Sequence, residues 1–293
     1  MNINVRETPL SPGVEPLTVP EGLPTLLRDL IHEYTGIYFD SGRYDVMLEK
    51  LSDLSRARGH RSFMEYYYLL KYEDKQRIEW QRVVEVLSVQ ETYFWREMPQ
   101  IRTLVDVLVP QWFAQSNTPL RIWSAACATG EEPYSIAMAL AEAGWGNHRI
   151  EIVASDASEE ALRRARRATY RERAFRSLPF HLQKKYFAEE DGLFRLNTDI
   201  VRRVRFERAN IVDRREIVGL AHSPVIFCRN VFIYFSPETI KRALYLFADA
   251  MPDRGKLFVG ASESLLKLTN DFQLEEINDA FVYVRRERAR KKT

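Results

Sequence analysis

The residues most suited to chemistry form a run of ten, SAACATGEEP, that directly follows a short apolar segment. Its side chains are nearly all small, so a ligand can approach the backbone closely. A dinucleotide-binding fingerprint would need three glycines, whereas the run has only Gly130. The adjacent carboxylates of Glu131 and Glu132 would repel a pyrophosphate at a helix N-terminus. The run therefore predicts a binding turn, which includes Ala126, for a ligand with a cationic end.

A second acidic position ends the next apolar segment, RIEIVAS, at Asp156. Asp156 follows Gly130 by 26 residues, near the offset of about 20 at which an acidic side chain accepts hydrogen bonds from ribose hydroxyls. The competing interpretation is an N-cap for the following helix, and Asp156 alone supports both equally. The acidic turn that precedes it favours the ribose.

Amide and charged groups follow two further apolar segments. Asn210 and Ile211 come after VRFER, and they suit a flat heterocycle held by one amide and one apolar face. Arg229 and Asn230 come after PVIFC, where polar groups beside a buried strand are unfavourable unless they serve a cleft. A ribose, an adenine-like ring and a cationic tail together describe S-adenosylmethionine.

All these positions follow predicted strands. LRIWSA, RIEIVAS, VRFER and PVIFC alternate with helical patterns, which predicts an α/β fold with a parallel, doubly wound sheet. Ligands bind such a sheet at the carboxyl ends of its strands, so the polar positions should meet at one edge. Near the end of the chain, KLFVGAS and AFVYVRR flank a Leu-rich segment and the polar loop around Asn270. They predict an antiparallel hairpin that closes the sheet.

The first part of the chain has a different pattern. Residues 1–20 are rich in proline and are expected to form a disordered tail. Apolar residues at three- and four-residue spacing then predict helices over 23–34, 44–57, 62–72 and 78–89. We therefore expect a helical N-terminal domain over 21–88, a linker over 89–118, the α/β domain over 119–286 and a basic tail over 287–293.

Composition argues against several classes of protein. The formal net charge of +2 is small for a nucleic-acid-binding protein, and no apolar run approaches the ~18 residues of a membrane span. The start of the chain lacks a secretory signal pattern, which favours a cytoplasmic location. The two cysteines and five histidines are scattered, so no metal site is predicted.

Four longer motifs occur in order along the chain: QETYFWRE, SAACATGEEPYSIAMAL, IVASDAS and FCRNVFIYF. Together they resemble the motifs of CheR-type methyltransferases, which esterify glutamate side chains of bacterial chemoreceptors, and the resemblance covers residues 22–285. It implies a small all-α N-terminal domain and a Rossmann-like methyltransferase domain with a small β-rich insertion, here at about 187–208. The implied partner is the cytoplasmic domain of a chemoreceptor, and we expect a monomer.

The resemblance also implies which residues form the cofactor pocket. Glu132 and Asp156 would contact the methionine and ribose portions of S-adenosylmethionine, and Asn210 with Ile211 would flank its adenosine. Gln90 departs from the family pattern, because asparagine often stands there. The other residues assigned to the pocket are Thr92, Arg96, Ala126, Arg229 and Asn230.

The implied reaction is direct displacement at the sulfonium methyl by a glutamate carboxylate, which yields a methyl ester and S-adenosylhomocysteine. A glutamate with an ordinary pKa near ~4.3 is already ionised at pH 7, so no general base is needed. Arg96 is predicted to hold the carboxylate in line, and Tyr234 to orient the attacking oxygen or to face the sulfonium. The competing interpretation of Arg96 is a surface salt bridge with Glu91 or Glu97.

Three further hypotheses concern regions outside this pocket. The insertion binds a receptor's C-terminal tail in some relatives, a preference that composition does not reveal. Cys127 and Cys228 adjoin the ends of neighbouring strands, so they are expected either as reduced thiols beside the cofactor cleft or as buried fillers. Basic side chains on the second predicted helix and its turn suit docking to an acidic receptor, and solubility explains them equally well. This basic set comprises Arg43, Lys50, Arg56, Arg58, His60 and Arg61.

Other functions remain compatible with parts of this pattern. The same fold and cofactor could serve another methyl acceptor, such as RNA or a small molecule, although the near-neutral charge disfavours RNA. A non-catalytic S-adenosylmethionine sensor is a second class, which the presence of Arg96 and Tyr234 disfavours. A nicotinamide-linked oxidoreductase is a third class, which the missing glycines disfavour.

Overall fold

The computed structural model of the chain describes residues 17–287, which form two compact units. The helical unit comprises the described residues up to Val89 together with Tyr234–Ser236, and the α/β unit comprises the other described residues. Of the tails expected over 1–20 and 287–293, residues 1–16 and 288–293 lie outside the described residues.

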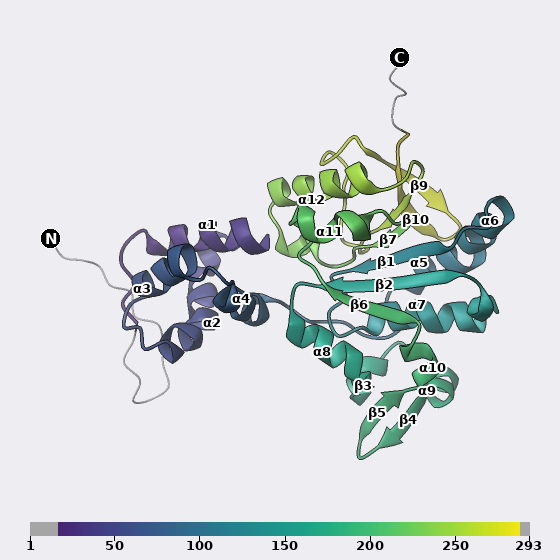
Figure 1. The fold of residues 1–293 in the computed structure, drawn as a ribbon, viewed down its shortest axis with the longest axis horizontal. Helices are drawn as coiled ribbons and strands as arrows, with labels where there is room; N and C mark the ends of the chain where they lie inside the picture. Colours follow the sequence, from purple (N-terminus) through teal and green to yellow (C-terminus); the bar gives the residue numbers. More distant parts are fainter. Residues whose placement is uncertain (1–16, 288–293) are drawn as a thin grey trace. The chain divides into compact units, whose positions relative to one another are not determined.

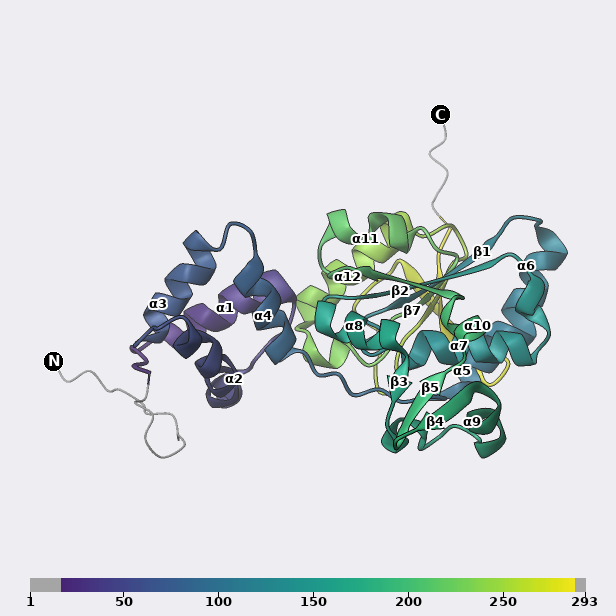
Figure 2. The same ribbon diagram turned by 60° about the horizontal axis from the view of Figure 1, so that its bottom comes forward.

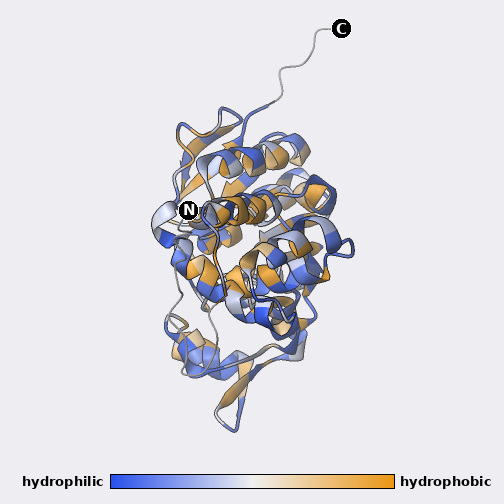
Figure 3. Ribbon diagram, turned by 90° about the vertical axis from the view of Figure 1, so that its left-hand side faces the viewer, coloured by the Kyte–Doolittle hydropathy of each residue, from blue (hydrophilic) through white to orange (hydrophobic). Residues whose placement is uncertain are grey.

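The helical unit contains the four predicted helices: α1 (Leu23–Thr35), α2 (Tyr44–Ala57), α3 (Phe63–Tyr68) and α4 (Ile78–Leu87). Each buries an apolar stripe; on α1, Leu27 and Ile31 lie one turn apart and are 0% exposed. In Figure 3, orange apolar and blue hydrophilic residues alternate along the helices. Residues Leu69–Glu73 continue α3 as a π-helical turn.

Residues 17–20 differ from the expected disordered tail. Leu17 and Val19 are 3% and 5% exposed, so both side chains belong to the core of the helical unit. Thr18 between them forms a bridge with Ser62, and its backbone N–H donates to the Arg61 carbonyl at 3.1 Å. Two apolar residues at alternating positions are enough to bury one face of a short extended segment, and the surrounding prolines masked that pattern.

The α/β unit is built on a seven-stranded sheet with the order β6-β2-β1-β7-β8-β10-β9 (Figure 1). The pairs among the first five strands are parallel, and β10 pairs antiparallel with β8 and β9. The strands are β1 (Leu120–Ala125), β2 (Ile150–Asp156), β6 (Val204–Arg208), β7 (Val225–Phe227), β8 (Lys256–Phe258), β9 (Phe272–Ile277) and β10 (Ala280–Arg285). The predicted parallel sheet is confirmed.

Helices cover both faces of this sheet (Figure 1). α7 (Glu131–Glu142) and α8 (Glu159–Arg167) lie on one face, and α11 (Arg214–Ala221) and α12 (Pro237–Ala250) lie on the other. The strand order reverses at β1, since β2 and β7 flank it on opposite sides. In open α/β sheets such a switch point opens the crevice in which ligands bind.

Residues 98–115, expected as part of a linker, form helices of the α/β unit. α5 (Met98–Thr103), a π-helical turn (Leu104–Leu108) and α6 (Val109–Gln115) follow one another directly. Ile101, Leu104 and Val109 are each 0% exposed. Their helical spacing makes an apolar stripe that packs into the core beneath the sheet.

A separate three-stranded sheet forms the β-rich insertion, with the order β3-β5-β4. Its strands are β3 (Thr169–Tyr170), β4 (Phe187–Glu190) and β5 (Leu193–Leu196), and Figure 2 shows it in front of the main sheet with the short helix α9 (Phe180–Tyr186). The expected bounds of 187–208 were wrong at both ends. β6 pairs with β2 in the main sheet, and β3 brings an earlier segment into the insertion.

The end of the chain closes the main sheet as predicted, but with one more strand. KLFVGAS and AFVYVRR contain β8 and β10, which are antiparallel. The segment between them contains β9, which forms the hairpin with β10 and becomes the edge strand. Among residues 17–287, no helix combines the length and the apolar character needed to cross a membrane.

Candidate active site

The turn after β1 is held in an unusual backbone conformation. Ala126, Ala128 and Gly130 have φ values of 55°, 47° and 91°. At Gly130 an added Cβ would lie 2.9 Å from the Ala165 Cβ, so this position requires glycine for both conformation and space. Left-handed non-glycine residues cluster at ligand sites, and here they bring the backbone of Ala126–Gly130 to the carboxyl edge of the sheet.

Asp156, at the end of β2, fixes this turn. Its Oδ2 accepts from the Ala128 N–H at 2.9 Å and its Oδ1 accepts from the Ser158 N–H at 2.9 Å. The N-cap interpretation was wrong, because Ser158 caps α8 with its own side chain. Burial raises the pKa of Asp156, while the backbone hydrogen bonds oppose that rise. A carboxylate offers about four acceptor positions, so Asp156 can also accept hydrogen bonds from hydroxyl groups.

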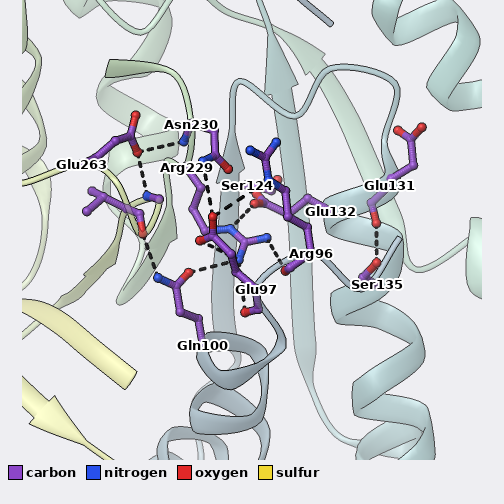
Figure 4. A network of polar contacts seen from close by, with 12 residues as sticks. Arg96, Glu97, Gln100, Ser124, Glu131, Glu132, Ser135, Arg229, Asn230 and Glu263 are labelled. Atoms are coloured by element: carbon purple, nitrogen blue, oxygen red, sulfur yellow. Dashed lines mark hydrogen bonds and ion pairs between the residues drawn. The ribbon is translucent and has the colours of Figure 1, made fainter. Parts of the chain in front are cut away.

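Arg229, two residues beyond the end of β7, is the centre of a polar network that Figure 4 shows. Its side chain is 2% exposed, and Nε donates to Glu132 Oε2 at 2.6 Å. Nη1 donates to Gln100 Oε1 at 3.0 Å. The backbone carbonyls of Glu97 and Arg96 accept from Nη1 and Nη2 at 3.4 and 3.1 Å. A buried guanidinium needs such pairing, and here the pairing joins the loop after β7 to α7, to α5 and to the segment before α5.

Glu131 and Glu132 are neighbours in sequence but point in different directions (Figure 4). Glu132 belongs to the network, where its Oε1 accepts from Ser124 Oγ at 2.6 Å. Glu131 is 4% exposed and accepts from Thr129 Oγ1 at 2.7 Å. Burial raises the pKa of Glu131 from 4.5 to about 7. The two carboxylates therefore have separate environments, and only Glu132 pairs with a cation of the network.

A second part of the network surrounds Asn230, whose φ is 60°. Its Nδ2 donates to Glu97 Oε1 at 3.3 Å, and its backbone N–H donates to Glu263 Oε2 at 2.8 Å. Beside it lies a cavity of about 630 Å³, whose lining includes Glu97, Gln100 and Glu263. Asn230 and Arg229 thus lie together, as expected of residues that follow one strand.

The charges of this network suit a cationic ligand. The network contains three carboxylates, of Glu97, Glu132 and Glu263, and two guanidinium groups, of Arg96 and Arg229, which leaves one net negative charge. Within the described part of the chain, Glu97 Oε2 is one of a few buried polar atoms without a hydrogen-bond partner. A buried acceptor that lacks a donor is explained by a ligand that supplies one.

Arg96 itself lies between two strained residues, since Trp95 and Glu97 have φ values of 68° and 52°. Its Nη1 donates to the Glu91 carbonyl at 3.1 Å, and its Nε is 3.9 Å from Glu97 Oε1. The guanidinium also lies over the Tyr93 ring at 5.4 Å from the centroid. The competing surface salt bridge is thus present only as a long contact, and the catalytic role of Arg96 stays a prediction.

Another residue of the QETYFWRE segment, Gln90, contacts the carboxyl edge of the sheet. Gln90 Nε2 donates to Ser158 Oγ at 3.2 Å, two residues beyond Asp156. Thr92 is half-buried. Phe94 is 0% exposed, and its ring contacts Tyr170, Phe175 and Phe187 of the insertion and its flanks. Phe94 therefore anchors the segment that carries Arg96.

The positions after β6 are also at the carboxyl edge of the sheet. Asn210 is 9% exposed; its Oδ1 accepts from the Val212 N–H at 3.2 Å, and its backbone N–H donates to Glu216 Oε2 at 2.8 Å. Ile211 is 4% exposed. These contacts turn the backbone at the end of β6, and the assignment of both residues to adenosine stays a prediction.

Tyr234 lies in a 3₁₀ turn (Phe232–Tyr234) and is grouped with the helical unit. Its carbonyl accepts from the Tyr38 N–H at 2.9 Å, and the next residue, Phe235, forms a bridge with Ile37. These contacts tie the segment after β7 into the helical unit. The proposed role of Tyr234 in methyl transfer stays a prediction.

The basic set on α2 divides by structure into two groups. Arg58 donates to Glu79, whose side chain is 1% exposed, and Lys50 donates to the Val86 carbonyl at 3.2 Å, so both stabilise the helical unit. Arg61 is exposed, and Arg56 is 21% exposed with two guanidinium nitrogens that are buried without hydrogen-bond partners. The Arg43 guanidinium lies 5.6 Å from the centre of the Phe39 ring.

Cys127 and Cys228 are free thiols, both buried. β1 and β7 are neighbours, as predicted. Burial raises the pKa of both thiols, and carboxylates add to the shift, first Asp156 for Cys127 and first Glu263 for Cys228. Over residues 17–287, no three His, Cys, Asp or Glu side chains are grouped to hold a metal ion.

Sequence reasoning gave no role in the site to four members of the network: Glu97, Gln100, Ser124 and Glu263. Ser124 was inside the quoted run but had no role, and Gln100 lay in the supposed linker. A signal existed for Glu263, because it follows the strand β8, and the rule that ligands bind beyond strand ends applies to β8 as well.

Comparison with known proteins identifies the family. Residues 25–88 match the model of the CheR methyltransferase all-alpha domain, and residues 90–281 match that of the CheR methyltransferase SAM binding domain. The chain is 34% identical over 261 residues to chemotaxis protein methyltransferase 2 of Vibrio cholerae serotype O1, covering 87% of this chain and 90% of that protein. It is 32% identical over 253 residues to the chemotaxis protein methyltransferase of Escherichia coli K12, covering 85% and 86%. The predicted fold and the cofactor S-adenosylmethionine are thereby confirmed, and the chain belongs to the CheR methyltransferase family.

Proposed function

We propose that this protein transfers the methyl group of S-adenosylmethionine to glutamate carboxylates of a chemoreceptor, which yields glutamyl methyl esters and S-adenosylhomocysteine. Its curated relatives are named chemotaxis protein methyltransferases. The observation that carries the proposal is the single net negative charge of the network around Arg229, in which Oε2 of Glu97 lies 3.7 Å from Arg229 Nη1 but accepts no hydrogen bond. The cofactor has two positively charged groups, a sulfonium and an ammonium, and one negatively charged carboxylate. Its net charge is therefore positive and opposite to that of the network.

In this proposal each strand end has one task. Asp156 accepts the ribose hydroxyls, because two of its acceptor positions are already fixed by backbone N–H groups and the others are free to bond. Glu132, oriented by Ser124 and Arg229, faces the methionine portion. Asn210 and Ile211 hold the adenine ring. Gln90, Thr92 and Ala126 complete the wall of the pocket.

The chemistry proposed for this chain is positional. Arg96 binds the acceptor carboxylate through a forked pair of donors and keeps it in line with the methyl group, and Tyr234 orients the attacking oxygen. The acceptor is ionised at neutral pH, so no side chain has to remove a proton. The proposed partner is the cytoplasmic domain of the receptor, which places the chain in the cytoplasm, and we expect it to act as a monomer.

The decisive experiment mixes the purified chain with radiolabelled S-adenosylmethionine and receptor-rich membranes, and then measures methanol released by base. Base-labile label on the receptor supports the proposal. Label in RNA or in a small molecule would show another acceptor, and cofactor binding without any transfer would show a non-catalytic sensor. Either result would refute the proposed reaction.

Arg96→Ala tests the proposed reaction centre. Only the Arg96 carbonyl contacts Arg229, and alanine keeps that carbonyl, so the network should survive the change. We expect turnover to fall roughly 100-fold or more, the scale seen when a preorganised charge-stabilising donor is removed. The matched control is Arg176→Ala, since Arg176 lies over the same Tyr93 ring and is 48% exposed. Equal turnover in the two variants, with both folded, would refute the role of Arg96.

Receptor docking is proposed for the members of the basic set that the structure does not show stabilising the helical unit, namely the exposed Arg43 and Arg61 and the 21% exposed Arg56. Reversal of Arg58 would place a carboxylate against Glu79 and unfold the unit, so it cannot test docking. Arg43→Glu with Arg61→Glu is the better pair, because both side chains are exposed. We expect slower receptor methylation at low salt and a smaller difference at high salt. Unchanged methylation at low salt would show that these charges serve solubility.

A further inference from the structure

Glu263 lies in the turn after β8 and is an unusual carboxylate, because backbone N–H groups provide three of its hydrogen bonds. Its Oε2 accepts from the Asn230 N–H at 2.8 Å and from the Gly260 N–H at 2.6 Å. Its Oε1 accepts from the Phe232 N–H at 2.7 Å. Glu263 is 9% exposed, and Figure 4 shows its carboxylate directed at Asn230. One side chain therefore joins two loops that follow neighbouring strands.

The loop after β7 depends on this carboxylate for its conformation. Asn230 has a φ of 60°, a left-handed conformation that an L-residue adopts only when its surroundings hold it there. The strand β7 ends at Phe227, so the N–H groups of Asn230 and Phe232 are beyond the sheet ladder. Buried N–H groups need acceptors, and Glu263 supplies one to each.

Gly260 holds the side chain of Asn230 in place. A Cβ added there would lie 2.4 Å from Asn230 Nδ2 and 3.0 Å from Asn230 Cγ. The Asn230 amide therefore packs directly on the Gly260 backbone, and its Nδ2 donates to Glu97 Oε1. The turn after β8 thus fixes Asn230 twice, through its backbone by Glu263 and through its side chain by Gly260.

We propose that Glu263 is a positioning residue of the active site, which acts through Asn230 and the loop to Phe232 rather than by touching the cofactor or the acceptor. The inference rests on the proposed assignment of Asn230 to the cofactor pocket. Loss of the carboxylate releases the loop, so Asn230 leaves the conformation in which its amide faces the network. The fold of the α/β unit does not require that conformation, since the strands β7 and β8 pair through their own ladder.

Two variants test this role by different routes. Glu263→Gln has the same shape, but its amide nitrogen would face N–H donors instead of accepting from them. Gly260→Ala keeps the charge of Glu263, but its Cβ would lie 2.4 Å from Asn230 Nδ2 and 2.9 Å from Glu263 Oε2, so it displaces the Asn230 side chain and crowds the carboxylate. The matched control is Glu276→Gln, the same chemical change at an exposed position of β9.

The first measurement is amide hydrogen exchange at Asn230, Phe232 and Gly260, which needs neither cofactor nor activity. For Glu263→Gln we expect exchange at these three amides to become at least 10-fold faster, while amides of β1 and β2 keep their protection. The second is the affinity for S-adenosylhomocysteine by calorimetry, which we expect to weaken at least 10-fold in both variants and not in Glu276→Gln. Turnover at saturating cofactor should fall in parallel, because Asn230 stays misplaced.

The possible outcomes separate this inference from the proposed function. Wild-type exchange rates and wild-type affinity in Glu263→Gln would overturn the positioning role and leave the methyltransferase proposal intact. A wild-type protein that binds no S-adenosylhomocysteine would refute the cofactor pocket, whatever the exchange shows. If Glu263→Gln does not fold, Gly260→Ala decides: unchanged affinity in that variant would overturn the inference.

Discussion

Arg229→Met should destabilise the α/β unit by about 3 kcal/mol. The guanidinium of Arg229 is 2% exposed and Glu132 is 12% exposed, so the change leaves the Glu132 carboxylate largely buried with Ser124 as its remaining donor. Removing one partner of a buried ion pair destabilises a protein by roughly 3–5 kcal/mol. The partial exposure of Glu132 places the expected value at the lower end. The carbonyls of Arg96 and Glu97 also lose their donor.

Urea unfolding measures the free energy of unfolding of each variant, and the slope of this free energy against urea concentration is compared between variants. Adding Glu132→Gln to Arg229→Met removes the stranded charge, so we expect the double variant to recover roughly half of the loss. Arg195→Met is the control, because Arg195 and Glu190 form a pair that is 62% and 61% exposed; its change should be below about 0.5 kcal/mol. A double variant no more stable than Arg229→Met would refute the stranded-charge explanation.

Two further predictions concern buried carboxylates. Burial raises the pKa of Glu131 from 4.5 to about 7, so the folded state binds its proton more tightly, and the free energy of unfolding should fall by on the order of 3 kcal/mol between pH 4.5 and pH 8. Glu131→Gln should remove this slope in urea unfolding at several pH values, and an unchanged slope would contradict the assignment. Glu79→Gln removes a charge that is 1% exposed and accepts from Arg58, Arg82 and Tyr66, so the helical unit should lose roughly 2–4 kcal/mol. Thermal unfolding measures this, and a loss below about 1 kcal/mol would show that the cluster does not stabilise the unit.

The elements that were predicted correctly are those with strong local patterns. The helices α1 and α2 have apolar stripes at helical spacing, and β1 and β2 are short apolar runs that end in polar residues. The strand β9 was missed because its burial pattern follows from its pairing with β10, and not from its own alternation. α5 and α6 were missed because the segment was interpreted as a linker between domains.

The sequence predicted which residues lie at the strand ends of the candidate site, but not which hydrogen-bond partners these residues have. The rule that ligands bind at strand ends selected Asp156, Arg229 and Asn230 as candidates, and the structure has each of them at or beyond the end of a strand. Their hydrogen-bond partners could not be inferred, since Arg229 and Glu132 are 97 residues apart and meet only because β7 lies beside β1. Glu263 shows the same limit: a glutamate in a turn gives no local sign that three backbone N–H groups will surround it.

The aromatic contacts of Phe94 have a consequence for how this protein can change over evolution. Phe94 stacks with Phe175 at 5.4 Å, and its backbone N–H donates to the Ala174 carbonyl at 2.9 Å. The core of the insertion is therefore completed by one aromatic ring, that of Phe94, from the segment that carries Arg96. A chimera that exchanged residues 169–196 with those of a relative would have to exchange Phe94 as well. The insertion and the reaction segment are thus expected to be inherited together, as one unit of variation.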